Sequence, residues 1–87
     1  MHESGMIEDL IAKVEDLARQ NSARRVLAVE VSIGSLAAIE AGHLGEHFLL
    51  ASQGTLAEGA ELRFREAGDP AARDPFGVFL ESVELET

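Results

Sequence analysis

The chain contains no cysteine, and in a protein of 87 residues this leaves side-chain packing alone to hold the fold together. Small domains commonly add disulfides or a structural metal, because a short chain buries little apolar surface. The missing cysteines exclude disulfides, iron–sulfur clusters, thiol catalysis and cysteine-based zinc fingers. We therefore expect one domain over residues 1–87, with a single small core drawn from its 46% apolar residues.

The excess of acidic residues limits the kinds of partner that the chain is expected to bind. Sixteen Asp and Glu residues against seven Lys and Arg give a formal charge of −9. Nucleic acids and anionic lipids both attract Lys and Arg, so neither nucleic-acid nor membrane binding is expected. There is no basic segment followed by an apolar run at the start, and no stretch approaches the roughly 20 apolar residues of a membrane span. These features predict a cytoplasmic protein.

The first segment predicts an amphipathic helix over residues 5–20. Apolar residues recur there with the helical period and define one face: Ile7, Leu10, Ile11, Val14, Leu17 and Ala18. Ser4 is expected to cap the N-terminal end of this helix. Asn21 is expected to adopt the left-handed conformation that ends it.

Three later segments alternate with a period of two, which is typical of strands with one buried face. They comprise residues 25–33, 60–66 and 76–85. The odd-numbered residues of the first strand, from Leu27 to Ile33, are large and apolar and are expected to be buried. In the last strand the apolar positions change from even to odd between Leu80 and Val83. A β-bulge near Glu81 would return them to one face.

A second helix is predicted between the first two strands, at residues 40–52, although Gly42 and Gly45 weaken it. Its apolar stripe is expected to comprise Leu44, Phe48 and Ala51. Both prolines lie in a loop at residues 68–75, before the last strand. The order α-β-α-β-β predicts a two-layer α+β domain, with a small three-stranded sheet packed against two helices.

Recognisable catalytic motifs are missing from the chain. It has no G-x-S-x-G elbow, no glycine-rich phosphate loop and no carboxylate in an apolar context, so we expect no enzyme. His43 and His47 lie four residues apart on the second helix, so both could face one metal ion. The alternative is a hydrogen-bonded, half-buried His47 with His43 at the helix edge, since no third ligand is spaced to complete a tetrahedral site.

The N-terminus carries another candidate metal site. The α-amine, the amide nitrogen of residue 2 and the Nδ1 atom of His2 can close fused chelate rings around one ion. Nitrogen donors in a plane suit Ni(II) or Cu(II), and Cu(II) would bind them more tightly. The bulky second residue favours retention of Met1, so the amine should belong to Met1. Protons compete for these donors, so binding weakens as the pH falls. A frayed terminus that binds nothing is the alternative.

Several segments together resemble the HypA/HybF family of hydrogenase nickel-incorporation proteins. They are the opening Met1-His2-Glu3, the strand Val29–Ile33 with the turn Gly34-Ser35-Leu36, the run Gly54-Thr55-Leu56-Ala57-Glu58-Gly59-Ala60-Glu61-Leu62, and the closing Ser82–Glu86. The resemblance implies a cytoplasmic metallochaperone that delivers nickel to [NiFe]-hydrogenase, and in some organisms to urease, with a GTPase partner. It also implies that Met1, His2 and Glu3 hold the nickel.

The chain departs from this family in one respect. The family carries a zinc domain with two C-x-x-C pairs between the last two strands, where this chain has only the loop 68–75. The resemblance therefore implies a zinc-free variant that binds Ni(II) through Met1, His2 and Glu3. The spacing of His43 and His47, and not the resemblance, makes these two residues additional candidate ligands. Its expected partners are a hydrogenase large-subunit precursor and a GTPase, and a homo-oligomer is compatible with the sequence. The alternative is a metal-independent interaction module of a metalloenzyme assembly pathway.

Overall fold

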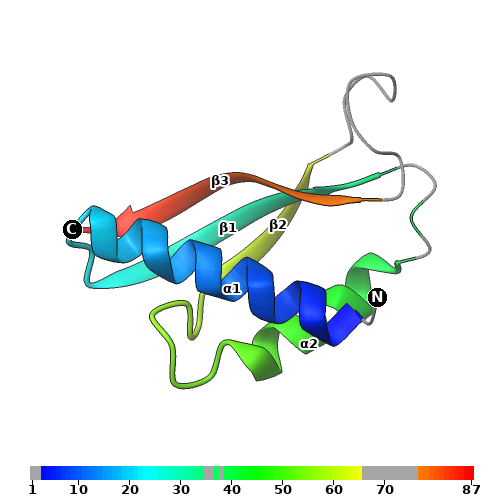
Figure 1. Cartoon of the computed structure of the whole chain (residues 1–87), viewed down its shortest axis with the longest axis horizontal. Coiled ribbons are helices and arrows are strands. Elements are labelled where there is room, and N and C mark those ends of the chain that lie inside the picture. Colours follow the sequence, from blue (N-terminus) through cyan, green and yellow to red (C-terminus); the bar gives the residue numbers. More distant parts are fainter. Residues whose placement is uncertain (1–2, 35–36, 38, 66–76) are drawn as a thin grey trace.

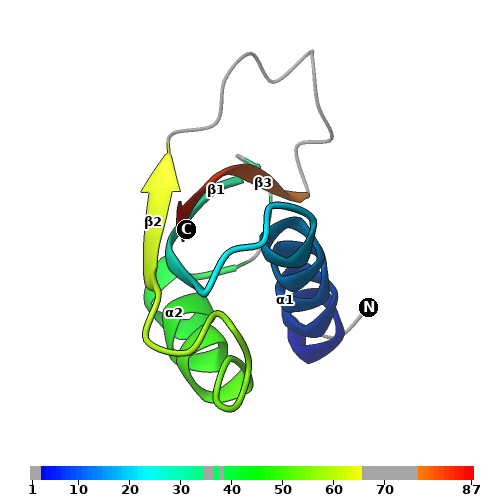
Figure 2. The ribbon, with the colours of Figure 1, turned by 90° about the vertical axis from the view of Figure 1, so that its left-hand side faces the viewer.

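The fold is built around a central strand. The computed structural model describes residues 3–34, 37, 39–65 and 77–87, and only the backbone of Glu3 and Ser4. Its elements are α1 (Glu3–Gln20), β1 (Arg25–Ile33), α2 (Ala41–Ala51), β2 (Glu61–Arg65) and β3 (Val78–Glu86). The sheet has the order β2-β1-β3, with β1 parallel to β2 and antiparallel to β3. Both helices lie on one side of the curved sheet (Figure 1, Figure 2), which confirms the predicted two-layer α+β fold.

The boundaries agree closely with the sequence predictions. β1 and the C-terminal end of α1 have the predicted bounds, and the other described ends differ from prediction by one or two residues. The loop predicted at residues 68–75, together with the strand residues predicted at 66 and 76, lies outside the described part of the chain. The apolar residues of the helices and of the strands recur with clearly different periods, which is why the pattern predicts these elements.

The core lies between the sheet and the two helices. Four apolar residues of the predicted α1 face are buried, and its other two, Leu10 and Leu17, are half-buried. The buried cluster comprises Ile7, Ile11, Val14 and Ala18 of α1, Val26, Val29 and Val31 of β1, Leu44 and Phe48 of α2, and Ala57. Each large aliphatic side chain of this kind contributes about 1.5–3 kcal/mol through removal from water. Packing of this cluster therefore replaces the cross-links that the chain lacks.

The end of α1 differs from the prediction in one detail. Ser22, rather than Asn21, adopts the left-handed backbone conformation, with φ 52°. The Ala23 N–H donates to the Ala18 carbonyl oxygen at 2.9 Å, a six-to-one bond that requires a left-handed residue directly before Ala23. Asn21 still helps to end the helix, because its side-chain Nδ2 donates to the Leu17 carbonyl oxygen at 2.7 Å.

The predicted burial of β1 is wrong at its beginning. Val26 and Ala28 are buried, whereas Leu27 is 39% exposed. In the pairing with β3, Val26 lies opposite Leu85 and Ala28 opposite Glu84, so Leu27 is an extra residue in a β-bulge. The bulge turns Leu27 outward and brings Val26 onto the helix-facing side. A strict period of two could not reveal this change of phase.

The second bulge confirms the prediction for the last strand. Glu30 of β1 lies opposite Ser82 and Val31 lies opposite Leu80, so Glu81 is the extra residue of β3. The apolar residues on both sides of the bulge consequently pack against the core: Val78, Leu80, Val83 and Leu85.

Charged side chains cover the sheet face that lies away from the helices. Ser32 on this face is nevertheless buried, and its hydroxyl donates to Glu81 Oε2 at 2.5 Å. Arg65 lies 2.6 Å from a Glu30 oxygen and 3.7 Å from a Glu81 oxygen, and the Glu81 side chain is only 12% exposed. The helices bury the apolar face of β1, and side chains of the neighbouring strands bury part of its polar face.

The predicted stripe of α2 is only partly correct. Leu44 and Phe48 are buried and His47 is half-buried, but Ala51 is exposed. Ser52 is buried instead, and its hydroxyl donates to the Leu49 carbonyl oxygen at 3.1 Å. Steps of four residues from Leu44 reach Ser52 rather than Ala51, so the buried face follows these steps beyond the last helical residue.

Truncation of the buried Leu44 side chain of α2 should destabilise the fold. We expect Leu44→Ala to lower the free energy of unfolding by about 2–5 kcal/mol, because it leaves a cavity in the cluster. Leu49→Ala on the same helix is the matched control and should change stability by less than about 0.5 kcal/mol, since Leu49 is 60% exposed. Urea unfolding followed by circular dichroism measures both, as the chain has neither Trp nor Tyr. Equal losses would contradict this assignment of the core.

Candidate metal site

The starts of the two helices lie at the same end of the molecule, on the right in Figure 1. α1 begins at Glu3, so Ser4, which was predicted to cap the helix, lies within its first turn. The predicted nickel ligands Met1 and His2 and the side chain of Glu3 lie outside the described residues. The first N–H groups of a helix have no partner within it, so helix formation leaves the Glu3 amide available to a ligand.

The first turns of α1 are fixed against the core. Ile7 is fully buried and Met6 packs against the same cluster. Glu8 and Asp9, in the second turn, are exposed, and their carboxylates add negative charge that attracts cations. Core packing therefore fixes the first turns of α1, and two exposed carboxylates lie on the second turn.

The structure brings His43 and His47 together. Both belong to the first turns of α2, and their ring centroids lie 4.5 Å apart with a tilt of 46° between the rings. His43 is exposed and His47 is half-buried. In the described part of the chain, no group of three or more His, Cys, Asp or Glu side chains could hold a metal ion. Within that part, His43 and His47 form a pair of metal-ligating side chains that does not belong to a group of three.

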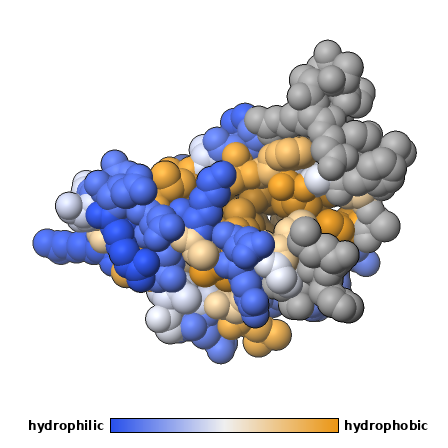
Figure 3. All heavy atoms as spheres, in the orientation of Figure 1, coloured by the Kyte–Doolittle hydropathy of each residue, from blue (hydrophilic) through white to orange (hydrophobic). Residues whose placement is uncertain are grey.

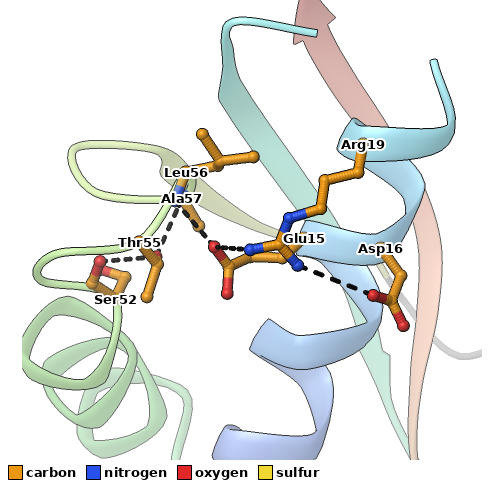
Figure 4. A network of polar contacts seen from close by, with 7 residues as sticks. All are labelled: Glu15, Asp16, Arg19, Ser52, Thr55, Leu56 and Ala57. Atoms are coloured by element: carbon orange, nitrogen blue, oxygen red, sulfur yellow. Dashed lines mark hydrogen bonds and ion pairs between the residues drawn. The ribbon is translucent and has the colours of Figure 1, made fainter. Parts of the chain in front are cut away.

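A polar network joins α1 to the segment that follows α2 (Figure 4). The Leu56 N–H donates to Glu15 Oε2 at 3.2 Å, and Arg19 lies 3.4 Å from the same oxygen. Within the segment, the Thr55 hydroxyl donates to the Ser52 carbonyl oxygen at 2.6 Å. The Leu56 carbonyl oxygen in turn accepts the Val26 N–H at 2.8 Å. Glu15 therefore holds the connection between α2 and β2 against α1.

The sequence analysis did not identify Glu15. Its partner Leu56 lies 41 residues further along the chain, and no local pattern signals such a contact. The Glu15 side chain is only 18% exposed, although Glu15 is a charged residue beside the buried face of α1. Charged residues often lie beside the apolar face of a surface helix, so the sequence offered no reason to single out Glu15.

Two glycines shape the same connection. Gly54 and Gly59 have φ values of 80° and 79°, which L side chains rarely adopt. The Gly54 N–H donates to Glu58 Oε1 at 3.1 Å, and the Ala57 N–H donates to Thr55 Oγ1 at 3.1 Å. The run of residues 54–62, on which the family resemblance partly rests, thus forms a structural connection, and its glycines are explained by backbone conformation.

A family model described as "Hydrogenase/urease nickel incorporation, metallochaperone, hypA" matches residues 1–71. This chain belongs to the HypA family. The match includes Met1, His2 and Glu3, the residues on which the resemblance began. The description of this family names a metallochaperone, in agreement with the prediction that the chain is not an enzyme.

Curated HypA relatives are longer than this chain. The Hydrogenase maturation factor HypA of Aquifex aeolicus is 44% identical over 62 residues, which cover 71% of this chain and 54% of the relative. The factor of the same name from Nitrosospira multiformis is 39% identical over 87 residues, which cover 100% of this chain and 70% of the relative. The chain therefore spans little more than half the length of the first relative.

Solved HypA structures share the fold. The solution structure of the Ni metallochaperone HypA from Helicobacter pylori superposes with a TM-score of 0.82 at 19% identity, covering 99% of this chain and 98% of that one. A second solution structure of a HypA protein gives 0.77 at 23% identity, covering 98% and 96%. These similarities confirm the α-β-α-β-β architecture. Within the part of the chain that is described, no helix is both long and apolar enough to cross a membrane.

Removal of the Glu15 carboxylate should loosen the connection after α2. We expect Glu15→Ala to lower the free energy of unfolding by about 1–2 kcal/mol, because the half-buried Leu56 N–H loses its acceptor. Amide hydrogen exchange at Leu56 should become faster at the same time. Asp16→Ala is the matched control, since the Asp16–Arg19 pair is solvent-exposed and contributes less than about 1 kcal/mol. Unchanged exchange at Leu56 in the Glu15 variant would contradict this role.

Proposed function

We propose that this chain binds Ni(II) through its first three residues and delivers it to the precursor of a nickel enzyme in the cytoplasm. The proposed client is the large subunit of [NiFe]-hydrogenase, and the proposed helper is a GTPase. The donors are the Met1 amine, the backbone amides that follow it and the His2 imidazole. The observation that carries this proposal is the match to the HypA family over residues 1–71, which includes Met1-His2-Glu3.

The structure of α1 supports this donor set. The helix begins at Glu3, so its first amides are not used by helical hydrogen bonds. A deprotonated amide and an amine are nitrogen donors that can lie in one plane around Ni(II), which suits its tetragonal geometry. Core packing of the first turns of α1 attaches residues 1–3 to a fixed point of the domain. A carrier that presents its metal to a client needs such a fixed attachment.

We further propose that nickel binding is independent of zinc in this protein. The sequence has no cysteine, so it cannot form the cysteine zinc site that the family resemblance implies. In this proposal residues 1–87 are one nickel-binding domain, and the loop 68–75 replaces the zinc module. Any contact that a zinc module makes with a client must then come from the α+β domain itself.

Nickel titration of three proteins tests the proposal. The native protein should bind one Ni(II) at the N-terminus with square-planar absorption, and this absorption should fade below about pH 6 as protons compete for the donors. His2→Ala should lose this absorption. A Gly-Ser extension before Met1 keeps the imidazole but removes the amine, and should lose it as well. Equal square-planar absorption in all three proteins would refute the chelate.

A second candidate function is docking to an assembly partner without metal. Leu49 and Leu50 are adjacent on α2 and are 60% and 65% exposed, which is unusual for large apolar side chains. Hydrophobic side chains are also visible at the lower edge of the space-filling view, over α2 (Figure 3). These residues favour a protein contact on the outer surface of α2, and a carrier could use it to dock its client.

Substitution of this pair separates the two functions. Leu49→Ser with Leu50→Ser should weaken binding to a purified hydrogenase large-subunit precursor, while the N-terminal nickel absorption stays as in the native protein. The matched control is Leu27→Ser, since Leu27 is 39% exposed but lies on β1. Precursor binding that survives the double substitution would exclude this surface.

A further inference from the structure

The paired histidines of α2 have the helical spacing and the ring separation that two ligands of one metal ion can have. Residues four apart on a helix lie on one face, and the two ring centroids are 4.5 Å apart. A metal–nitrogen bond of about 2 Å places each centroid about 3.2 Å from the ion, so two rings at a right angle on one ion have centroids about 4.5 Å apart. The separation between His43 and His47 therefore matches two neighbouring ligands of a square or octahedral ion.

Exposed carboxylates flank His43 on both sides along the chain. His43 is exposed and His47 is half-buried beside the buried Leu44, so one ring is held by the domain while the other faces solvent. Glu40 and Glu46, three residues before and three after His43, are both exposed. Their negative charge offsets the positive end of the α2 dipole, which would otherwise repel a cation. Water can complete the coordination on the exposed side.

We propose that His43 and His47 form a second metal site, which binds Ni(II) or Cu(II) through two neighbouring imidazole nitrogens and is independent of the N-terminal chelate. Imidazole is a preferred ligand of both ions, and both accept ligands at right angles. The remaining positions of the ion are filled by water, so the ion stays exchangeable. The site goes beyond the proposed N-terminal function and requires neither the amine of Met1 nor the imidazole of His2.

The pair supports binding rather than catalysis. Residues 43–47 read His-Leu-Gly-Glu-His, which fits the H-x-x-E-H pattern of one class of zinc peptidases. A hydrolytic zinc centre of this kind uses three protein ligands, and no such group of three exists among the residues that the structure describes. A two-imidazole site with water ligands binds its ion more weakly and releases it more readily than a closed site.

The test uses the full chain with the Gly-Ser extension before Met1, so that the amine chelate cannot contribute. Ni(II) and, separately, Cu(II) are titrated by calorimetry, and NMR spectra of ¹⁵N-labelled protein are recorded with Ni(II). We expect one equivalent to bind, and high-spin Ni(II) to broaden the amide resonances of α2 selectively. His43→Gln and His47→Gln should each weaken binding about tenfold or more, because each leaves a single imidazole where the second had acted as an intramolecular ligand.

A spacing control distinguishes chelation from the mere presence of histidines. Gly42→His combined with His43→Gly keeps the number of histidines but separates the two rings by five positions, on different faces of α2. This variant should bind as weakly as the single His variants, with an unchanged circular dichroism spectrum. Binding as tight as in the parent, or no selective broadening of α2 in the parent, would overturn the proposal.

The two metal sites can fail separately. In the protein without the extension, His43→Gln with His47→Gln should keep the square-planar absorption of the N-terminal chelate and lose the broadening of α2. Loss of both signals in that double variant would show that the histidines belong to the N-terminal site, and would overturn the independence claimed here.

Discussion

The pairing of β1 with both of its neighbours is the constraint on which the other features depend. Because β1 and β2 are parallel, α2 must run back across the sheet and start near the end of β1. α1 precedes β1 by a short turn and also runs opposite to it, so both helices start at the same end (Figure 1). Glu3, at the start of α1, and the histidines of α2 consequently lie at the same end of the domain, although about 40 residues separate them in sequence.

This arrangement is held without any cross-link. Valines of β1 pack against apolar residues of both helices in one buried cluster. Outside that cluster, the Leu56 N–H donates a hydrogen bond to Glu15. The Leu56 carbonyl oxygen accepts a second hydrogen bond from the Val26 N–H of β1. The segment after α2 is therefore joined to a helix and to the central strand at once. In a domain of this size such a contact restrains the relative position of α1 and α2.

Sequence periodicity predicted the elements and the fold class well, because each element has one clearly apolar face. It also predicted the bulge at Glu81, since the change from even to odd positions is visible in the sequence. The bulge at Leu27 could not be found in this way, because its apolar neighbours hide the change of phase. The burial of Ser32 and the role of Glu15 depend on partners from distant strands and segments, which no local pattern contains. For the candidate metal sites, the spacing of His43 and His47 predicted their proximity, whereas Met1 and His2 lie outside the described residues.

The central claim is that the first residues of this cysteine-free HypA-family chain bind nickel through nitrogen atoms. Nickel K-edge X-ray absorption on the protein carrying His43→Gln and His47→Gln, with one equivalent of Ni(II) and no added residues before Met1, tests it most directly. A four-coordinate ion with nitrogen ligands at short distances and the scattering of one imidazole is the predicted result. A six-coordinate, oxygen-rich ion without imidazole scattering would contradict the claim.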